Sequence, residues 1–139
     1  MSVSTKGFTL IELLVVIAIL AVLSTISIIS YGGYIESSAQ KAAENSLRAM
    51  SIAQQEYKSN NGSYFPTSGA TGTCAPTATT TANIITTLFG EIDNLTSQRY
   101  NFCTTGDSAS YTLVAKHKTA TCQLSLTNFN ILTPSGCDV

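Results

Sequence analysis

The chain has 139 residues, and seven lysine and arginine residues nearly balance eight aspartate and glutamate residues, for a net charge of -1. This balance excludes the strongly basic class of nucleic-acid-binding proteins, and the single histidine leaves few options for acid–base catalysis. The sequence contains no P-loop, nucleotide fingerprint or zinc-protease motif. We therefore predict no catalytic residue, no cofactor and no metal site.

A long apolar segment lies near the start of the sequence. Leu13 to Ile35 contains no charged residue, and as a helix it would be roughly 34 Å long at about 1.5 Å per residue. The hydrocarbon core of a bilayer is roughly 30 Å thick, so the segment is long enough to cross a membrane. Glu12 stands directly before it. A carboxylate near hydrocarbon is costly, which indicates a function and a positively charged partner.

The residues before this segment carry a family signature. Gly7-Phe8-Thr9-Leu10-Ile11-Glu12, followed by an apolar helix, resembles the prepilin signal of type IV pilins and pseudopilins. The resemblance implies that a prepilin peptidase cuts after Gly7 on the cytoplasmic side and that Phe8 is then N-methylated. It also implies that the helix anchors the subunit in the inner membrane and later packs into a filament core. The implied role of Glu12 is to pair with the free amine of a neighbouring subunit.

The two other interpretations of this segment fit less well. An ordinary secretory signal has an apolar core of about 7 to 15 residues with its cleavage site behind it. Here the core is longer and Gly7 lies in front of it. A simple single-pass anchor does not explain why a costly carboxylate stands at position 12.

The helical pattern continues beyond the apolar segment. Its apolar residues recur at spacings of three and four and are Ile35, Ala39, Ala42, Ala43, Leu47, Met50, Ala53 and Tyr57. This stripe predicts one buried face, and Glu44 and Arg48 have the spacing of a favourable i, i+4 ion pair. Stop signals follow at 59–62, so we predict a single helix from Phe8 to about Ser59.

Two adjacent glycines, Gly32 and Gly33, interrupt this helical pattern. Each weakens a helix by about 1 kcal/mol relative to alanine. Many pilins carry a proline within the apolar helix, where the helix melts on assembly, but no proline occurs here between Phe8 and Phe65. We therefore predict that the glycine pair replaces that proline as the site of local melting.

In the second half of the chain the sequence pattern predicts loops and then strands. Residues 67–83 are rich in threonine and small residues and are typical of a loop, and Ile84 to Phe89 favours one or two helical turns. The β-rich segments are Arg99 to Cys103, Tyr111 to Lys116, Thr121 to Leu126 and Phe129 to Leu132. Their alternation requires a cover on one face, which the helix stripe supplies. We predict an α+β fold, a long helix packed on an antiparallel sheet of three to four strands, as in the pilin fold.

The four cysteines are Cys74, Cys103, Cys122 and Cys137. All follow the apolar segment, and an even number on the non-cytoplasmic side predicts disulfides. The close cysteine pairs typical of a zinc site are missing. The residues alone leave three connectivities open. Because pilins often close a C-terminal loop with a disulfide, the resemblance implies Cys122–Cys137, which leaves Cys74 and Cys103 for the second.

One basic cluster, Lys116-His117-Lys118, is predicted at an exposed strand end. Some minor pilins bind DNA, so Lys116 and Lys118 are candidate DNA contacts. The charge balance argues against that role. Residues 60–139 hold three basic residues, Arg99, Lys116 and Lys118, against four acidic ones, Glu91, Asp93, Asp107 and Asp138.

These observations lead to one hypothesis. The chain divides into a leader (1–7), an apolar helix (8–35) and a globular head (36–139), the head comprising a helix (36–59), a loop region (60–98) and a sheet with a C-terminal loop (99–139). It is expected to be a non-enzymatic subunit of a type IV pilus-like filament, and the near-neutral head favours a minor pilin. The expected partners are other pilin subunits, the inner membrane, the prepilin peptidase and the pilus assembly machinery.

The expected location is the inner membrane with a periplasmic head, and then the extracellular filament. Two alternatives remain, a type II secretion pseudopilin and a DNA-binding competence pilin. Four cysteines and few acidic calcium ligands argue against the pseudopilin.

Overall fold

The computed structural model describes residues 7–67, 73–91 and 95–137. The chain divides into two compact units, Met1–Glu36 and Ser37–Val139. The long helix α1 (Leu10–Asn61) contributes to both of them. We describe each unit by itself.

The first unit is the apolar part of α1. Among the described residues, α1 is the one helix that is long and apolar enough to cross a membrane. Its backbone stays helical through Gly32 and Gly33, because about 1 kcal/mol per glycine is too little to break a helix of this length. The helix is continuous here, as the predicted single helix requires, and local melting at the glycine pair in an assembled filament remains a prediction.

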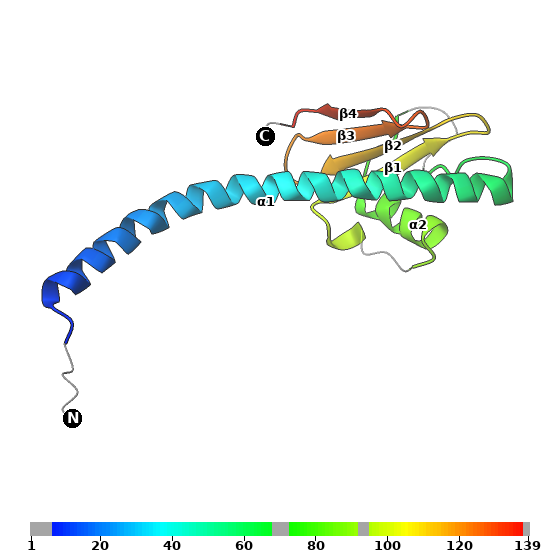
Figure 1. Cartoon of the computed structure of the whole chain (residues 1–139). Helices are drawn as coiled ribbons and strands as arrows, with labels where there is room; N and C mark the ends of the chain where they lie inside the picture. The colour runs from blue at the N-terminus through cyan, green and yellow to red at the C-terminus, as the bar shows by residue number, and fades with distance from the viewer. Residues whose placement is uncertain (1–6, 68–72, 92–94, 138–139) are drawn as a thin grey trace, which may run out of the picture. The chain divides into compact units, whose positions relative to one another are not determined.

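The second unit contains a sheet of four strands in the order β1-β2-β3-β4, with every neighbouring pair antiparallel. The strands are β1 (Tyr100–Gly106), β2 (Tyr111–His117), β3 (Gln123–Thr127) and β4 (Leu132–Ser135). Figure 1 shows them side by side, with β1 nearest the short helix α2 and β4 at the other edge. The predicted α+β architecture, a long helix with an antiparallel sheet, is confirmed.

The fourth strand begins three residues later than the sequence predicts. Asn130 adopts a left-handed conformation, with φ of 60°, which asparagine tolerates better than most residues. Its N–H donates to Thr127 O at 2.9 Å, and Thr127 N–H donates to Ile131 O at 3.2 Å. Phe129 and Asn130 therefore form the β3–β4 turn, and β4 starts at Leu132.

The turn between β1 and β2 depends on Asp107 and Gly106. Asp107 Oδ1 accepts hydrogen bonds from the N–H groups of Ser110 and Ala109, both at 2.7 Å. These bonds hold the pKa of Asp107 below its usual value. At Gly106 a Cβ atom would lie 2.9 Å from Tyr64 Cβ, so glycine is required for the segment after α1 to pass this closely.

The core lies between the second half of α1 and one face of the sheet. Its most deeply buried residues are Ala43, Leu47, Met50, Ile84, Leu95, Phe102, Leu113, Ala115, Leu124 and Leu126. The predicted stripe on α1 is thus largely correct, but Ala42 is exposed. Gln54, which the stripe did not include, is fully buried.

Gln54 is buried because its amide binds a second segment of backbone. Its Oε1 accepts from Phe65 N–H at 2.8 Å, and its Nε2 donates to Phe65 O at 2.8 Å. Nε2 also donates to Thr104 Oγ1 on β1 at 3.0 Å. A single side chain therefore joins α1, the segment that follows it and the sheet.

The threonine-rich segment contains more helix than expected. Helix α2 spans Ala78–Leu88, where the sequence predicted a loop to residue 83. Thr77 caps it, since its side chain accepts from Thr80 N–H while the Thr80 hydroxyl accepts from Thr77 N–H. Thr81 Oγ1 then accepts from Phe102 N–H of β1 at 2.9 Å. A 3-10 helix, η1, follows at Leu95–Ser97.

The expected ion pair on α1 is wrong. Glu44 pairs with Lys41 at 3.1 Å, and not with Arg48. Arg48 instead donates to Asn130 Oδ1 in the β3–β4 turn at 3.3 Å. The tertiary fold brings that turn to Arg48, and a surface i, i+4 pair is too weak to compete, at about 0.3–0.5 kcal/mol.

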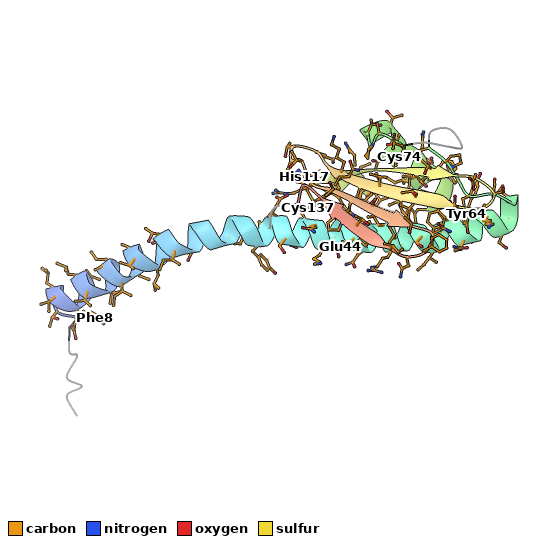
Figure 2. The ribbon with its side chains drawn as sticks, turned by 90° about the horizontal axis from the view of Figure 1, so that it is seen from above. Phe8, Glu44, Tyr64, Cys74, His117 and Cys137 are labelled. Carbon is orange, nitrogen blue, oxygen red and sulfur yellow. A yellow bond between two sulfur atoms is a disulfide. The ribbon has the colours of Figure 1, made fainter. Side chains whose placement is uncertain are left out.

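Two disulfides tie this unit together, Cys74–Cys103 and Cys122–Cys137. This is the pairing that the resemblance implied. Cys74–Cys103 packs with Val114 on the sheet face away from α1. Cys122–Cys137 joins the start of β3 to the C-terminal segment, and Figure 2 shows Cys137 near His117, at the end of the sheet away from Tyr64.

We expect no free thiol in the folded chain. Loops of 29 and 15 residues should each stabilise the fold by roughly 3 kcal/mol or more in the chain-entropy model. Alkylation without reductant, followed by peptide mapping, should label none of the four cysteines, and the same procedure after reduction in denaturant should label all four. Quantitative labelling of any two without reductant would contradict the pairing.

Candidate functional site

The start of α1 is built around Thr9 and Glu12. The helix begins at Leu10, so Thr9 is its N-cap and Glu12 its third residue. Glu12 Oε2 accepts from Thr9 N–H at 2.8 Å and from the Thr9 hydroxyl at 2.7 Å, while Glu12 N–H donates to Thr9 Oγ1 at 3.3 Å. This reciprocal arrangement is a capping box. Thr-x-x-Glu before an apolar run is its signature, so this cap could have been recognised from the sequence.

Glu12 is thereby held in one position on an apolar surface. Its neighbours Phe8, Ile11, Val15 and Val16 form an open groove with it, of about 420 Å³. All hydrogen bonds to the carboxylate among the described residues reach Oε2. The other oxygen, Oε1, remains available to a further donor, so the site can receive a cation without losing its cap.

The residues next to the predicted cleavage point are open to the surroundings. Phe8 is 82% exposed, and a Cβ atom added to Gly7 would meet nothing within 4 Å. Figure 2 shows Phe8 just before the helix begins. This backbone is therefore accessible to an enzyme, and the fold itself does not require glycine at position 7.

The basic cluster Lys116-His117-Lys118 is only partly exposed, whereas the sequence predicted an exposed strand end. Lys116 and Lys118 are exposed, and Lys118 Nζ donates to Thr96 O at 3.0 Å. His117 is buried, at 7% exposure, because its position in β2 points to the face that α1 covers. Its Nδ1 accepts from the N–H groups of Ala120 and Thr119 at 2.9 and 3.2 Å. The expectation of an exposed histidine is wrong, and alternation along β2 would have corrected it.

The described residues contain no group of three or more histidine, cysteine, aspartate or glutamate side chains that could hold a metal ion. Within this part of the chain the four cysteines are all in disulfides. Glu12 is thus the site residue whose environment points most directly to a binding event, because it is a carboxylate on an apolar surface.

The fold and this site together define a class of protein. A glycine and an aromatic residue precede an exposed apolar helix with a glutamate in its first turn, and the same helix continues into an α+β head. Residues 4–28 match the family of the prokaryotic N-terminal methylation motif. No curated protein matches the chain significantly. The matched segment supports a type IV pilin-like prepilin.

Proposed function

We propose that this chain is a structural subunit of a type IV pilus-like filament. In this proposal a prepilin peptidase cuts after Gly7, Phe8 becomes the methylated N-terminus, and α1 anchors the subunit in the inner membrane until the assembly machinery incorporates it. The observation that carries the proposal is the match to the methylation motif at residues 4–28, on a helix whose large apolar side chains from Phe8 to Ile26 are exposed.

The exposure of α1 supports this proposal. Large apolar side chains from Phe8 to Ile26 are between 45% and 83% exposed. Burying one such side chain is worth about 1.5–3 kcal/mol, so this first part of the helix needs an apolar environment. A bilayer supplies that environment before assembly, and the helices of other subunits supply it afterwards.

Glu12 gives the assembled helices a defined register. Cleavage after Gly7 creates an ammonium group on Phe8, and in an apolar filament core that charge is costly unless a carboxylate neutralises it. The Oε1 atom of a neighbouring Glu12 accepts no hydrogen bond from the described residues and is suited to this. The positive end of the helix dipole also attracts a carboxylate. Together with the capping box, it keeps the Glu12 carboxylate at the start of α1, near the end of the chain that carries the Phe8 amine.

The sequence favoured a minor pilin, and the number of copies in a filament remains part of the proposal. The structure offers little support for DNA capture. Lys118 is occupied by the Thr96 carbonyl, and Lys116 is then the exposed member of the cluster without a recorded hydrogen bond. Strong DNA binding normally requires several cations that release counterions together.

Processing is the direct test of the proposal. We expect the protein extracted from membranes and from sheared filaments to begin at Phe8 and to carry one methyl group on its amine. N-terminal mass analysis measures both features. The control is Gly7→Val. A Cβ atom at this position would meet nothing within 4 Å, so the loss of the glycine before the cleavage point should be the main effect, and the variant should accumulate uncut in the membrane. A wild-type protein that keeps its leader, or that begins inside the apolar segment, would exclude the proposed processing.

A further inference from the structure

The turn between β3 and β4 forms an apolar projection beside α1. Phe129 is 77% exposed and Ile131 is 59% exposed, and between them Asn130 accepts a hydrogen bond from Arg48 at 3.3 Å. We call these four residues the hairpin knob. Exposed aromatic and arginine side chains that lie together are typical of the centre of a protein–protein interface.

The charge of the knob is not neutralised within the described residues. The ion pair recorded there joins Lys41 to Glu44, and the hydrogen-bond partner of Arg48 is the neutral amide of Asn130. A partner for the knob should therefore present a carboxylate beside apolar surface.

The same head carries a hollow whose walls are mainly polar and offer a carboxylate together with a smaller apolar part. A half-open cleft of about 240 Å³ lies between the last turns of α1 and the end of α2. Its walls include Ala53, Glu56, Tyr57, Asn60, Thr87 and Leu88. Leu88 and Ala53 supply apolar surface, and Glu56 is an exposed carboxylate with no ion pair recorded among the described residues.

The knob and the cleft lie on opposite flanks of the head. The knob follows β3 and leads into β4, the strand at one edge of the sheet, whereas α2 packs on β1 at the other edge. Figure 1 shows α2 and β4 separated by the intervening strands. A contact between two different surfaces of identical subunits is heterologous, and repeated without closure it produces an open helical filament.

We propose that the hairpin knob of one subunit docks into the α1–α2 cleft of a second copy of this chain, with Arg48 facing Glu56 of the neighbouring copy. This inference rests on the proposed filament function. It adds a head-to-head contact to the helix contacts at Glu12, and it takes the chain to polymerise with its own copies, in place of the minor role that the sequence favoured.

Charge reversal tests the contact in full-length protein assembled in cells. Arg48→Glu and Glu56→Arg should each lower the amount of this subunit in sheared filaments by about fivefold or more, because like charges would then face each other. The double variant should recover most of the wild-type amount. Lys116→Glu, an exposed change outside both surfaces, is the matched control and should have no effect. A double variant no better than either single variant would overturn the proposal.

Cysteine crosslinking gives an independent result. With Ile131→Cys and Asn60→Cys in the same chain, mild oxidation of filaments should produce a ladder of dimers, trimers and longer species, and each single variant should stay monomeric. Ala109→Cys with Asn60→Cys is the control pair, because Ala109 lies in the β1–β2 turn, outside both surfaces.

Each other result has a distinct meaning. Filaments that contain the double-cysteine chain but give no ladder would overturn the knob–cleft contact and leave the proposed filament function standing. Dimers from Ile131→Cys alone would show a symmetric contact between knobs and would also overturn it. Absence of the wild-type chain from filaments would overturn both proposals.

Discussion

Glu12→Gln is expected to leave the protein in the inner membrane and to reduce its amount in sheared filaments by at least about tenfold. Glutamine at the third position of a helix still accepts the hydrogen bond from Thr9 N–H, so the capping box survives and the charge alone is lost. A neighbour's Phe8 ammonium would then be buried without a carboxylate, which costs about 3–5 kcal/mol when one partner of a buried pair is removed. Immunoblots of membrane and filament fractions measure the outcome.

Two further variants separate the charge from the cap. Thr9→Val removes the hydroxyl that binds Glu12 but keeps the carboxylate, so we expect a smaller loss from filaments, since a capping residue is worth about 1 kcal/mol. Glu12→Ala removes both features and should be at least as defective as Glu12→Gln.

Membrane insertion is the internal control for these variants. It should persist in all three, because the two Glu12 variants remove a charge near hydrocarbon, which eases insertion, and Thr9→Val adds none. If Glu12→Gln is present in filaments at the wild-type amount while Thr9→Val is not, then the cap and not the charge sets the register.

Gln54→Leu is expected to destabilise the head by about 3 kcal/mol. Leucine matches the apolar surroundings, but it leaves Phe65 N–H and Phe65 O without the partners that Gln54 provides at 2.8 Å. Each unsatisfied backbone group costs about 1–3 kcal/mol. For a domain of this size the change corresponds to a drop in Tm of at least about 12 °C. Thermal unfolding of the full chain in detergent, followed by near-ultraviolet circular dichroism of its tyrosines, measures it.

The neighbouring glutamine is the matched control. Gln55 is exposed and its recorded hydrogen bond is a long one of 3.4 Å from Tyr64 OH, so Gln55→Leu should change stability by no more than about 0.5 kcal/mol. Equal effects of the two changes would mean that the Gln54 amide contributes nothing specific to the junction.

The sequence by itself determined the parts of this protein that depend on local pattern. The apolar segment after Glu12 follows from composition, and the helix stripe at Ala43, Leu47 and Met50 follows from a period near 3.6 residues. The sheet follows from alternation. The motif at Gly7 and Phe8 is equally local, and residues 4–28 match the methylation motif as a contiguous segment.

Only the tertiary structure decided features that depend on residues far apart in the chain. Gln54 is polar and the apolar pattern passes over it, yet Phe65 and Thr104 make it a buried residue. Arg48 has an acidic residue at the right local spacing, yet it binds Asn130, 82 positions away. For Gln54, satisfying the polar groups that the fold buries is worth about 1 kcal/mol or more, which outweighs an apolar pattern that passes over it. For Arg48, a surface i, i+4 pair is worth only a few tenths of a kcal/mol, so the position of the β3–β4 turn decides its partner.

In the threonine-rich segment, local sequence and tertiary contacts each determine part of a single helix, α2. Composition predicted a loop at residues 67–83, and the capping box at Thr77 and Thr80 could have been recognised from the sequence. The attachment of Thr81 to Phe102 could not, because it needs the edge of β1 beside it. A helix of 11 residues is marginal alone, and packing against the sheet stabilises it.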